Sequence, residues 1–234
     1  MVKKKTEKFF KENYRKSWEY LKESKNFIYA ILIIFFLFVL IGAFVPVSES
    51  LEKQILQYIQ KLLEMTEGMS MGGLISFIFL NNFQSSFFAM IFGTAFGIFS
   101  IVVSVLNGYL LGFVSSITVH EAGISVLWRL FPHGIFELPA LFISAGLGLK
   151  LGLPFVYRYF EYYWKRKNTL ALIAGILFLP LSIILTLISN KNLRKYQFRD
   201  FLFKLNNSLR IFIFIIFPLL LIAAIIEGIL IAFF

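Results

Sequence analysis

Long uncharged stretches of apolar residues dominate the chain and predict where it crosses a membrane. A spanning helix needs about 20 mainly apolar residues to cross roughly 30 Å of hydrocarbon. Six hydrophobic segments approach or meet this length, and we expect five or six of them to span fully. They cover residues 27–45, 83–105, 108–119 with 124–130, 135–149, 169–189 and 211–234. The pattern predicts an all-α, polytopic helical membrane protein.

Three further segments carry apolar residues at helical spacing among polar ones, which is typical of helices lying on a membrane surface. Residues 10–21 predict a basic amphipathic helix before the first span, and residues 198–209 predict another before the last. Residues 51–62 form an acidic counterpart. The two basic helices suit the anionic lipids of an inner leaflet. Packing against the protein's own loops explains the same pattern equally well.

Lys and Arg in short loops predict the orientation, because cytoplasmic loops carry more of them. Residues 1–26 hold nine basic side chains, so we expect a cytoplasmic N-terminus, and the mostly acidic segment 46–70 fits the outer side. The segments 150–168 and 190–207 are both basic, which conflicts with a full crossing by residues 169–189. Either that segment crosses and the rule fails once, or it re-enters without crossing. We favour six segments and leave the side of the C-terminus open.

The same pattern divides one membrane domain into three consecutive parts. Residues 1–26 are the basic amphipathic helix, and residues 27–152 form a membrane core. Residues 153–234 hold basic loops, the fifth hydrophobic segment and the last span.

Composition strengthens the membrane prediction and removes several functions. Of the 234 residues, 59% are apolar and 15% charged, against about 45–50% and 25% in soluble domains. The absence of Cys excludes disulfides, thiolate metal sites and cysteine nucleophiles. The net charge of +10 lies mostly in the three basic flanks, so it reflects topology and does not indicate a nucleic-acid partner.

Small residues recur at four-residue spacing in two places and indicate close helix packing. In lipid, helices associate largely through such small residues, which let backbones approach each other. We expect intramolecular or dimer packing here, and a glycine-lined conduit is the alternative. The residues are Ala89, Gly93, Gly97, Ser104, Gly108 and Gly112.

The sharpest polar feature lies between the third and fourth hydrophobic segments. Pro132 suits the first turn of a helix, so His133 and Glu137 should share a helix face. A carboxylate inside a membrane usually faces a partner or water. A structural ion pair, a proton-coupled transport path and a metal site are open, and metal is the weakest because the chain has only two His. The predicted intramembrane polar cluster comprises His120, Glu121, Arg129, His133, Glu137 and Glu227.

Glu227 is the single charge in the last segment, whose Ile, Leu and Phe side chains outweigh its insertion cost. We expect it to meet Arg129 or His133 if the last helix runs beside the cluster. Three asparagines are predicted helix caps, turn residues or donors at a pore mouth: Asn81, Asn82 and Asn107.

Enzyme motifs are missing. The sequence has no Gly-x-Ser-x-Gly elbow and no phosphate-binding loop, and its single Asp excludes a paired-aspartate protease. We therefore predict no catalytic residues, no metal and no cofactor.

An ordered set of motifs resembles the stage II sporulation protein M family. The most specific motif is the run Pro132-His-Gly-Ile-Phe-Glu-Leu-Pro-Ala140. The others are Asn81-Asn82, Gly93-x-x-x-Gly97, Asn107-Gly108-x-x-x-Gly112 and the Ala-Ala-x-x-Glu motif ending at Glu227. The resemblance implies a polytopic membrane core with His133, Glu137 and Glu227 as its polar residues. The family's namesake acts in engulfment as the membrane-embedded partner of cell-wall hydrolases. The chain departs from the family pattern in two places. After Glu227, Gly-Ile-Leu-Ile replaces an aromatic residue and Thr-Pro, and residues 153–207, with their extra hydrophobic segment, are longer than the same region of the short bacterial members.

We therefore predict a non-enzymatic, multi-pass protein of the cell membrane that acts as a scaffold or partner of other membrane or envelope proteins. Self-association into a homo-oligomer and contact with anionic inner-leaflet lipids are expected. The alternative is a transporter or channel whose path is lined by Arg129, His133, Glu137 and Glu227.

Overall fold

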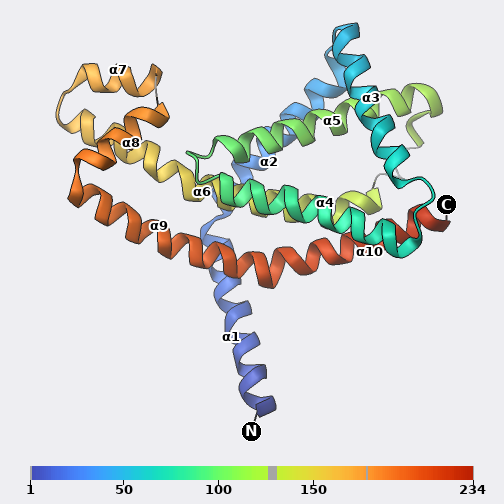
Figure 1. Ribbon diagram of the computed structural model, residues 1–234, viewed down its shortest axis with the longest axis horizontal. Coiled ribbons are helices and arrows are strands. Elements are labelled where there is room, and N and C mark those ends of the chain that lie inside the picture. The colour runs from blue at the N-terminus through green and yellow to red at the C-terminus, as the bar shows by residue number, and fades with distance from the viewer. Residues whose placement is uncertain (1, 126–130, 178, 234) are drawn as a thin grey trace.

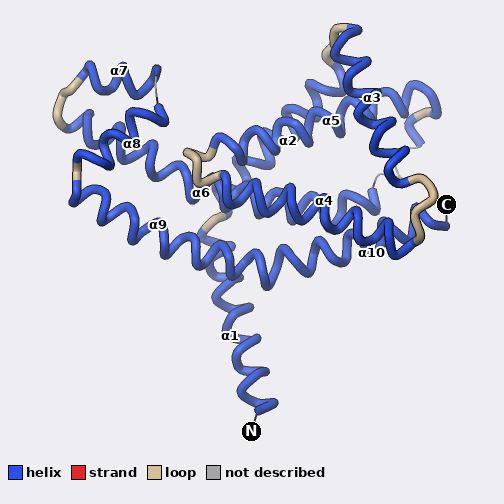
Figure 2. Tube along the Cα trace, in the orientation of Figure 1, coloured by secondary structure: helices blue, strands red, loops and turns tan. Residues whose placement is uncertain are grey.

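The computed structural model describes residues 2–125, 131–177 and 179–233. Within these ranges the chain forms helices joined by short turns, and no strand occurs (Figure 2). The predicted all-α class is confirmed.

Five helical segments are long and apolar enough to cross a membrane. They are α2 (Lys25–Phe44), α4 (Met71–Phe92), α5 (Ile98–Ala122), α6 (Phe131–Lys165) and the run formed by α9 (Lys191–Ile211), a π-helical turn (Phe212–Ile216) and α10 (Phe217–Phe233). They lie roughly along one axis and form the bundle (Figure 1). The protein is therefore a multi-pass membrane protein.

The fifth hydrophobic segment does not cross. It divides into α7 (Thr169–Leu177) and α8 (Leu179–Ser189), which pack on each other as a hairpin. Helices of 9 and 11 residues measure about 14 and 17 Å, roughly half of the hydrocarbon thickness. Among the described residues, five helical segments are therefore long and apolar enough to span, and the hairpin is not one of them. The two basic segments on either side of the hairpin consequently lie at the same end of the bundle (Figure 1), which removes the conflict in the charge pattern.

Two amphipathic helices run across the bundle axis at its opposite ends (Figure 1). The basic helix α1 (Val2–Glu23) precedes α2, and the acidic helix α3 (Glu49–Thr66) follows it. The Ser48 hydroxyl caps α3 by accepting a hydrogen bond from the Leu51 N–H, and Ser70 caps α4 in the same way at Gly73. This placement matches helices that lie in the plane of each membrane surface.

Backbone contact through glycine fixes the spacing of the bundle. A Cβ at Gly108 or Gly112 would overlap the carbonyl oxygens of Phe35 and Val39, so α5 lies directly against α2. On the other side, a Cβ at Gly93 would lie 2.5 Å from the Gly148 Cα, which brings α4 against α6. Such contacts give dispersion attraction that larger side chains would prevent.

Aromatic rings fill the space between α4 and the last span. Phe212 meets Phe83 and Phe87 edge-on, with ring centroids 5.4 Å apart in both pairs. Phe217 meets Phe79 in the same geometry, also at 5.4 Å. The Phe side chains of α4 therefore pack against the start of the last span.

The boundaries of the second and third spans differ from the prediction. The predicted segment 83–105 is divided by a turn at residues 93–97, where Gly97 adopts a left-handed backbone with φ of 78°. Asn107 and Gly108 lie inside α5 rather than in a turn. The second span instead begins at Met71, within a stretch that its glycines and asparagines make less apolar.

The last span begins with a π-helical turn, Phe212–Ile216, just before Pro218. The Phe217 N–H donates to the Phe212 carbonyl across five residues. Pro218 has no N–H to give the Phe214 carbonyl, and the wider turn accommodates this missing bond.

Candidate functional site

A large groove opens between four helices near the end of the bundle that carries α3. It has a volume of about 710 Å³, and its walls come from α2, α3, α5 and α6. Tyr58, Ile59 and Leu62 of α3 form one wall, as the apolar face of an amphipathic helix should. We call this feature the α3-roofed groove. Its size is within the range of sites that bind ligands or partner segments.

The walls of the groove are mostly apolar but hold a few polar groups. Asn107 and Ser115 come from α5 and Glu137 comes from α6. Asn107 donates its side-chain amide to the Val103 carbonyl of its own helix at 2.8 Å. Pro139, also on the wall, lacks the N–H that would bond the Ile135 carbonyl. The groove therefore offers an apolar surface with polar positions on α5 and α6.

The structure describes the side chains of three members of the predicted polar cluster, Glu137, Glu227 and His120, so the cluster as a whole stays a prediction. Glu137 is half-buried on the groove wall. Glu227 is half-buried on α10, one residue before Gly228, where a Cβ would overlap Ile75 of α4. His120 is exposed near the end of α5. Helix α6 begins at Phe131, so Pro132 does lie in its first turn. Arg129 and the side chains of Glu121 and His133 lie outside the described residues.

None of the three predicted asparagine caps is a cap. Asn81 and Asn82 are in the middle of α4, whose cap is Ser70, and Asn107 is in the middle of α5. Asn82 is buried between helices and Asn81 is exposed. A polar residue beside an apolar run resembles a helix start in water, but in a membrane helix it can face a neighbouring helix.

The predicted small residues lie at helix contacts within one chain. Gly108 and Gly112 touch α2, and Gly93 and Gly97 touch α6. Ala89 and Ser104 are fully buried. The Ser100 hydroxyl donates to the Ala89 carbonyl at 2.9 Å, which joins α5 to α4.

A buried lysine forms a second polar site, at the end of the bundle that carries α1. Lys150 of α6 is 8% exposed, and its Nζ donates to the Ser24 hydroxyl at 2.9 Å. The same Nζ lies 3.6 Å from the centre of the Tyr20 ring, a cation–π geometry. Ser24 in turn donates to the Tyr20 carbonyl at 2.7 Å. These contacts tie the α1–α2 junction to α6.

Burial strongly affects Tyr20, which lies in α1 outside the spans. Loss of solvent raises the pKa of its hydroxyl well above the usual 10.0, and the nearby Glu23 and Asp200 carboxylates raise it further. The Ser208 hydroxyl works in the opposite direction. Tyr20 is consequently neutral at physiological pH.

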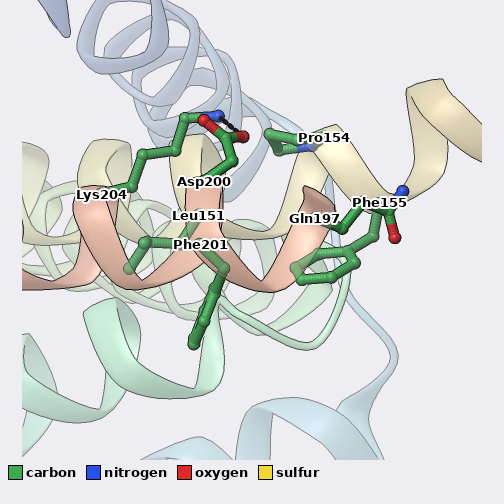
Figure 3. A pocket seen from close by; sticks show the side chains of 7 residues that line it. All are labelled: Leu151, Pro154, Phe155, Gln197, Asp200, Phe201 and Lys204. Atoms are coloured by element: carbon green, nitrogen blue, oxygen red, sulfur yellow. Dashed lines mark hydrogen bonds and ion pairs between the residues drawn. The ribbon is translucent and has the colours of Figure 1, made fainter. Parts of the chain in front are cut away.

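A small cavity adjoins the same end, between α6 and α9 (Figure 3). Its volume of about 10 Å³ matches one water molecule. Pro154 and Gln197 line it, together with Asp200 and Lys204, which pair at 2.7 Å. The Gln197 side chain is 5% exposed. The surface that lines the cavity is nevertheless mostly apolar, because Leu151, Phe155 and Phe201 contribute to it.

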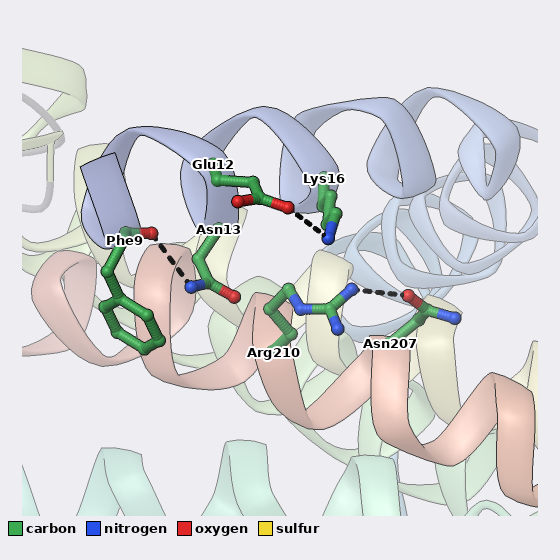
Figure 4. A network of polar contacts seen from close by, with 6 residues as sticks. All are labelled: Phe9, Glu12, Asn13, Lys16, Asn207 and Arg210. Atoms are coloured by element: carbon green, nitrogen blue, oxygen red, sulfur yellow. Dashed lines mark hydrogen bonds and ion pairs between the residues drawn. The ribbon is translucent and has the colours of Figure 1, made fainter. Parts of the chain in front are cut away.

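Helix α1 crosses the α9 end of the last span (Figure 4). Arg210 donates to the Asn207 side chain at 2.8 Å, and Lys16 pairs with Glu12 at 2.6 Å on the α1 surface. Phe9 and Tyr14 of α1 touch the Phe214 ring, with centroids 6.3 and 5.5 Å apart. The aromatic face of α1 therefore packs partly on the protein. Phe9 and Trp18 still remain 57% and 55% exposed.

Among the described residues, no three His, Asp or Glu side chains lie close enough together to bind a metal ion. The described residues thus form two candidate sites, the α3-roofed groove and the buried contacts of Lys150 with Ser24 and Tyr20.

Comparison with known proteins identifies the family. An uncharacterized protein of Methanocaldococcus jannaschii is 32% identical over 99 residues, which cover 38% of this chain and 44% of that protein. The chain thus aligns with less than half of this relative's length. No solved structure matches the chain. The model of the stage II sporulation protein M family matches residues 31–230, from the first span to the last. The chain therefore belongs to the stage II sporulation protein M family.

Proposed function

We propose that this protein is a non-enzymatic membrane scaffold that binds another membrane or envelope protein in the α3-roofed groove. The groove itself is the observation that carries the proposal, because four helices leave about 710 Å³ open between them. An amphipathic or transmembrane helix laid into a groove is a common mode of recognition.

The polar positions on the groove walls favour a protein segment over an acyl chain. An acyl chain has no hydrogen-bonding group, whereas a helix offers polar side chains that can pair with Asn107 or with the Ile135 carbonyl. Membrane helices associate through such hydrogen bonds together with close packing. Glu137 places a carboxylate on the same wall.

Packing beyond the groove argues against a transport path. Residues 144–152 of α6 are buried without interruption. A Cβ at Gly146 would lie 2.9 Å from the Ile28 Cα, and one at Gly148 would lie 3.1 Å from the Met90 Cα. On these two faces of α6 the helix backbones lie in direct contact, which argues against a water path there.

The charge pattern supports a cytoplasmic position for the end of the bundle that carries α1 and the α7–α8 hairpin. With five spans, the basic segments 1–26, 150–168 and 190–207 all lie at that end. The exposed aromatic side chains of α1 and its Lys-rich face then suit anionic lipids of the inner leaflet. The groove and the acidic α3 accordingly face the outside, where envelope proteins act.

Site-specific photo-crosslinking in native membranes tests the scaffold function. A photoreactive residue at Ile135, on the groove wall, should form an adduct with a distinct membrane or envelope protein. The same residue at Leu221, exposed on α10 and away from the groove, is the matched control. Val114→Trp fills the groove and should abolish the Ile135 adduct without changing the elution volume of the purified protein.

Three results would replace the proposal. Equal adducts at Ile135 and Leu221 would show that the groove has no preference. An adduct of twice the 27.1 kDa mass would assign the groove to self-association. Ion flux in reconstituted vesicles that disappears in Glu137→Gln would assign the protein to transport.

A further inference from the structure

A shallow basic groove runs along one face of α9. Its volume is about 550 Å³, and its lining residues recur at helical spacing, so they share one side of the helix. Gln197 and Phe201, on the other side of α9, point into the small cavity against α6 (Figure 3). We call this feature the α9 basic groove. It is lined by Asn192, Lys195, Tyr196, Arg199, Asp200 and Phe203.

The apolar face of α9 packs on the rest of the protein rather than on the membrane surface. Helix α9 continues through the π-helical turn into α10, so it follows the bundle axis (Figure 1). Its apolar residues Phe201, Leu205 and Leu209 pack against the core of the bundle. Any contact of α9 with lipid therefore uses its other face, which carries the α9 basic groove.

The α9 basic groove holds an excess of positive charge. Lys195 and Arg199 are exposed, and neither has an acidic partner among the residues that the structure describes. The Asp200 carboxylate is already balanced by the Lys204 Nζ, 2.7 Å away. A third cation lies beside the groove, because the Arg158 guanidinium sits 4.4 Å from the centre of the Tyr196 ring and donates to its hydroxyl at 3.3 Å. This charge distribution favours an anionic ligand.

Packing between α6 and α9 gives the level of the groove along the bundle axis. A Cβ at Gly152 would overlap the Gly93 carbonyl, so Gly152 marks the level at which α4 ends. Phe155 of α6 packs against Phe201 of α9, with ring centroids 5.9 Å apart. The two helices run in opposite directions, so moving three residues back along α6 corresponds to moving about three residues forward along α9. Phe203 is therefore approximately level with Gly152.

These levels match the layers of a phospholipid leaflet. Helix α4 has 22 residues, about 33 Å, so its end, and Phe203 with it, lies close to the edge of the hydrocarbon. Arg199 is one turn further out, about 6 Å, within a headgroup layer that is about 5–8 Å thick. Lys195 is about 12 Å out, which is within a Debye length of the headgroups.

We propose that the α9 basic groove binds the headgroup phosphate of an anionic phospholipid. Arg199 is the principal contact, since a guanidinium donates two parallel hydrogen bonds to phosphate oxygens. Lys195 adds charge that disfavours a zwitterionic lipid, whose headgroup carries its own cation. Phe203 is 64% exposed and offers an apolar surface to the acyl chains, which a water-soluble phosphate ester would leave uncovered. The site lies at the other end of the bundle from the α3-roofed groove and does not depend on the partner proposed there.

Native mass spectrometry of the full chain in detergent tests the proposal, because it counts bound lipids and gives their affinity. The protein is titrated with dioleoylphosphatidylglycerol, and dioleoylphosphatidylcholine is the zwitterionic control. The double variant Lys195→Gln with Arg199→Gln removes two charges from the groove. The matched control, Lys191→Gln with Arg194→Gln, removes the same two charges from exposed positions of α9 that do not line the groove.

We expect one phosphatidylglycerol to bind the wild type more tightly than phosphatidylcholine does. A Lys or Arg near an anionic lipid strengthens binding about five-fold, so the groove variant should bind phosphatidylglycerol about 25-fold more weakly. The control variant should bind it as the wild type does. If the groove variant elutes abnormally, Lys195→Gln and Arg199→Gln are measured singly, each with an expected loss of about five-fold.

Three outcomes would overturn the proposal. Equal affinity of the groove variant and the control variant would show that only net charge matters. Equal affinity of the wild type for the two lipids would show that the groove does not select an anionic headgroup. Displacement of the bound lipid by glycerol 3-phosphate would assign the groove to a free phosphate ester.

Discussion

The glycine contacts between α2 and α5 lead to the most demanding prediction. Gly112→Ala would add a methyl group that overlaps the Val39 carbonyl and lies 2.8 Å from the Val39 carbonyl carbon and 3.0 Å from the Ala43 nitrogen. All three are backbone atoms, so no side-chain rotation relieves the overlap. The two helices must move apart at the point where Gly108 also touches the Phe35 backbone.

Overpacking of this kind costs about 1–3 kcal/mol of folding free energy. A cost of 1 kcal/mol lowers the melting temperature of a chain of this size by about 2–4 °C, so the expected loss is about 2–12 °C. The loss is measured by thermal unfolding of the purified protein in one detergent, followed by intrinsic fluorescence and by the fraction that remains monodisperse.

Gly72→Ala is the matched control. Gly72 is in α4, has a helical backbone and has nothing within 4 Å of its added Cβ. Alanine in place of glycine in an open helical position gains up to about 1 kcal/mol, so this variant should melt at the same temperature or slightly higher. If Gly112→Ala melted together with Gly72→Ala, the close approach of α2 and α5 would be wrong.

Three further predictions concern the α1 end and the topology. Ser24→Ala should destabilise the protein by about 1–3 kcal/mol in thermal unfolding, because it leaves the buried Lys150 ammonium without its acceptor. Lys150→Met should cost less stability. It should also rescue Ser24→Ala in the double variant. The raised pKa of Tyr20 predicts a contribution to stability that is complete below about pH 10 and is lost as pH rises further; Tyr20→Phe should flatten this loss and remove the last tyrosine to ionise in an ultraviolet titration. In intact cells, a membrane-impermeant maleimide should label Lys53→Cys on α3 and not Lys191→Cys on α9, and the reverse result would invert the proposed orientation.

The sequence was sufficient for the helical class and for most of the spans, because hydrocarbon thickness sets the length of an apolar helix. The amphipathic helices α1 and α3 were also predictable from their periodicity. The number of spans was not. Residues 169–189 are as apolar as a true span, and tertiary contacts, such as those of Tyr159 and Tyr163 with α7 and α8, show that the segment folds back.

The start of α4 and the interior of α5 were mispredicted for one physical reason. Asn82 and the pair Asn107-Gly108 resemble caps and turns because in water such residues compete with the helix. In a bundle, Asn82 is buried between helices, Asn107 bonds its own helix and Gly108 lets two backbones meet. Local propensity is overridden by packing.

The candidate site was predictable in part. Glu137 was identified from its cost in a membrane, and it does line the groove. The groove itself was not predictable, since its walls combine four helices distant in sequence. Lys150 was missed because a lysine at the end of an apolar run usually marks only the membrane surface. Its partner Ser24 is 126 residues away, and no local pattern connects the two.

The π-helical turn between α9 and α10 makes residues 191–233 one continuous helical rod with an offset in its middle. One surplus residue in that turn rotates everything after it by about 100°. Removing a residue from Phe212–Ile216 would therefore swing Gly228 away from Ile75 and turn Glu227 to a different neighbour, while α9 stayed where it is. The direction in which each side chain of α10 points thus depends on the number of residues in this turn. The five phenylalanines and isoleucines of the turn are otherwise interchangeable in their side-chain chemistry.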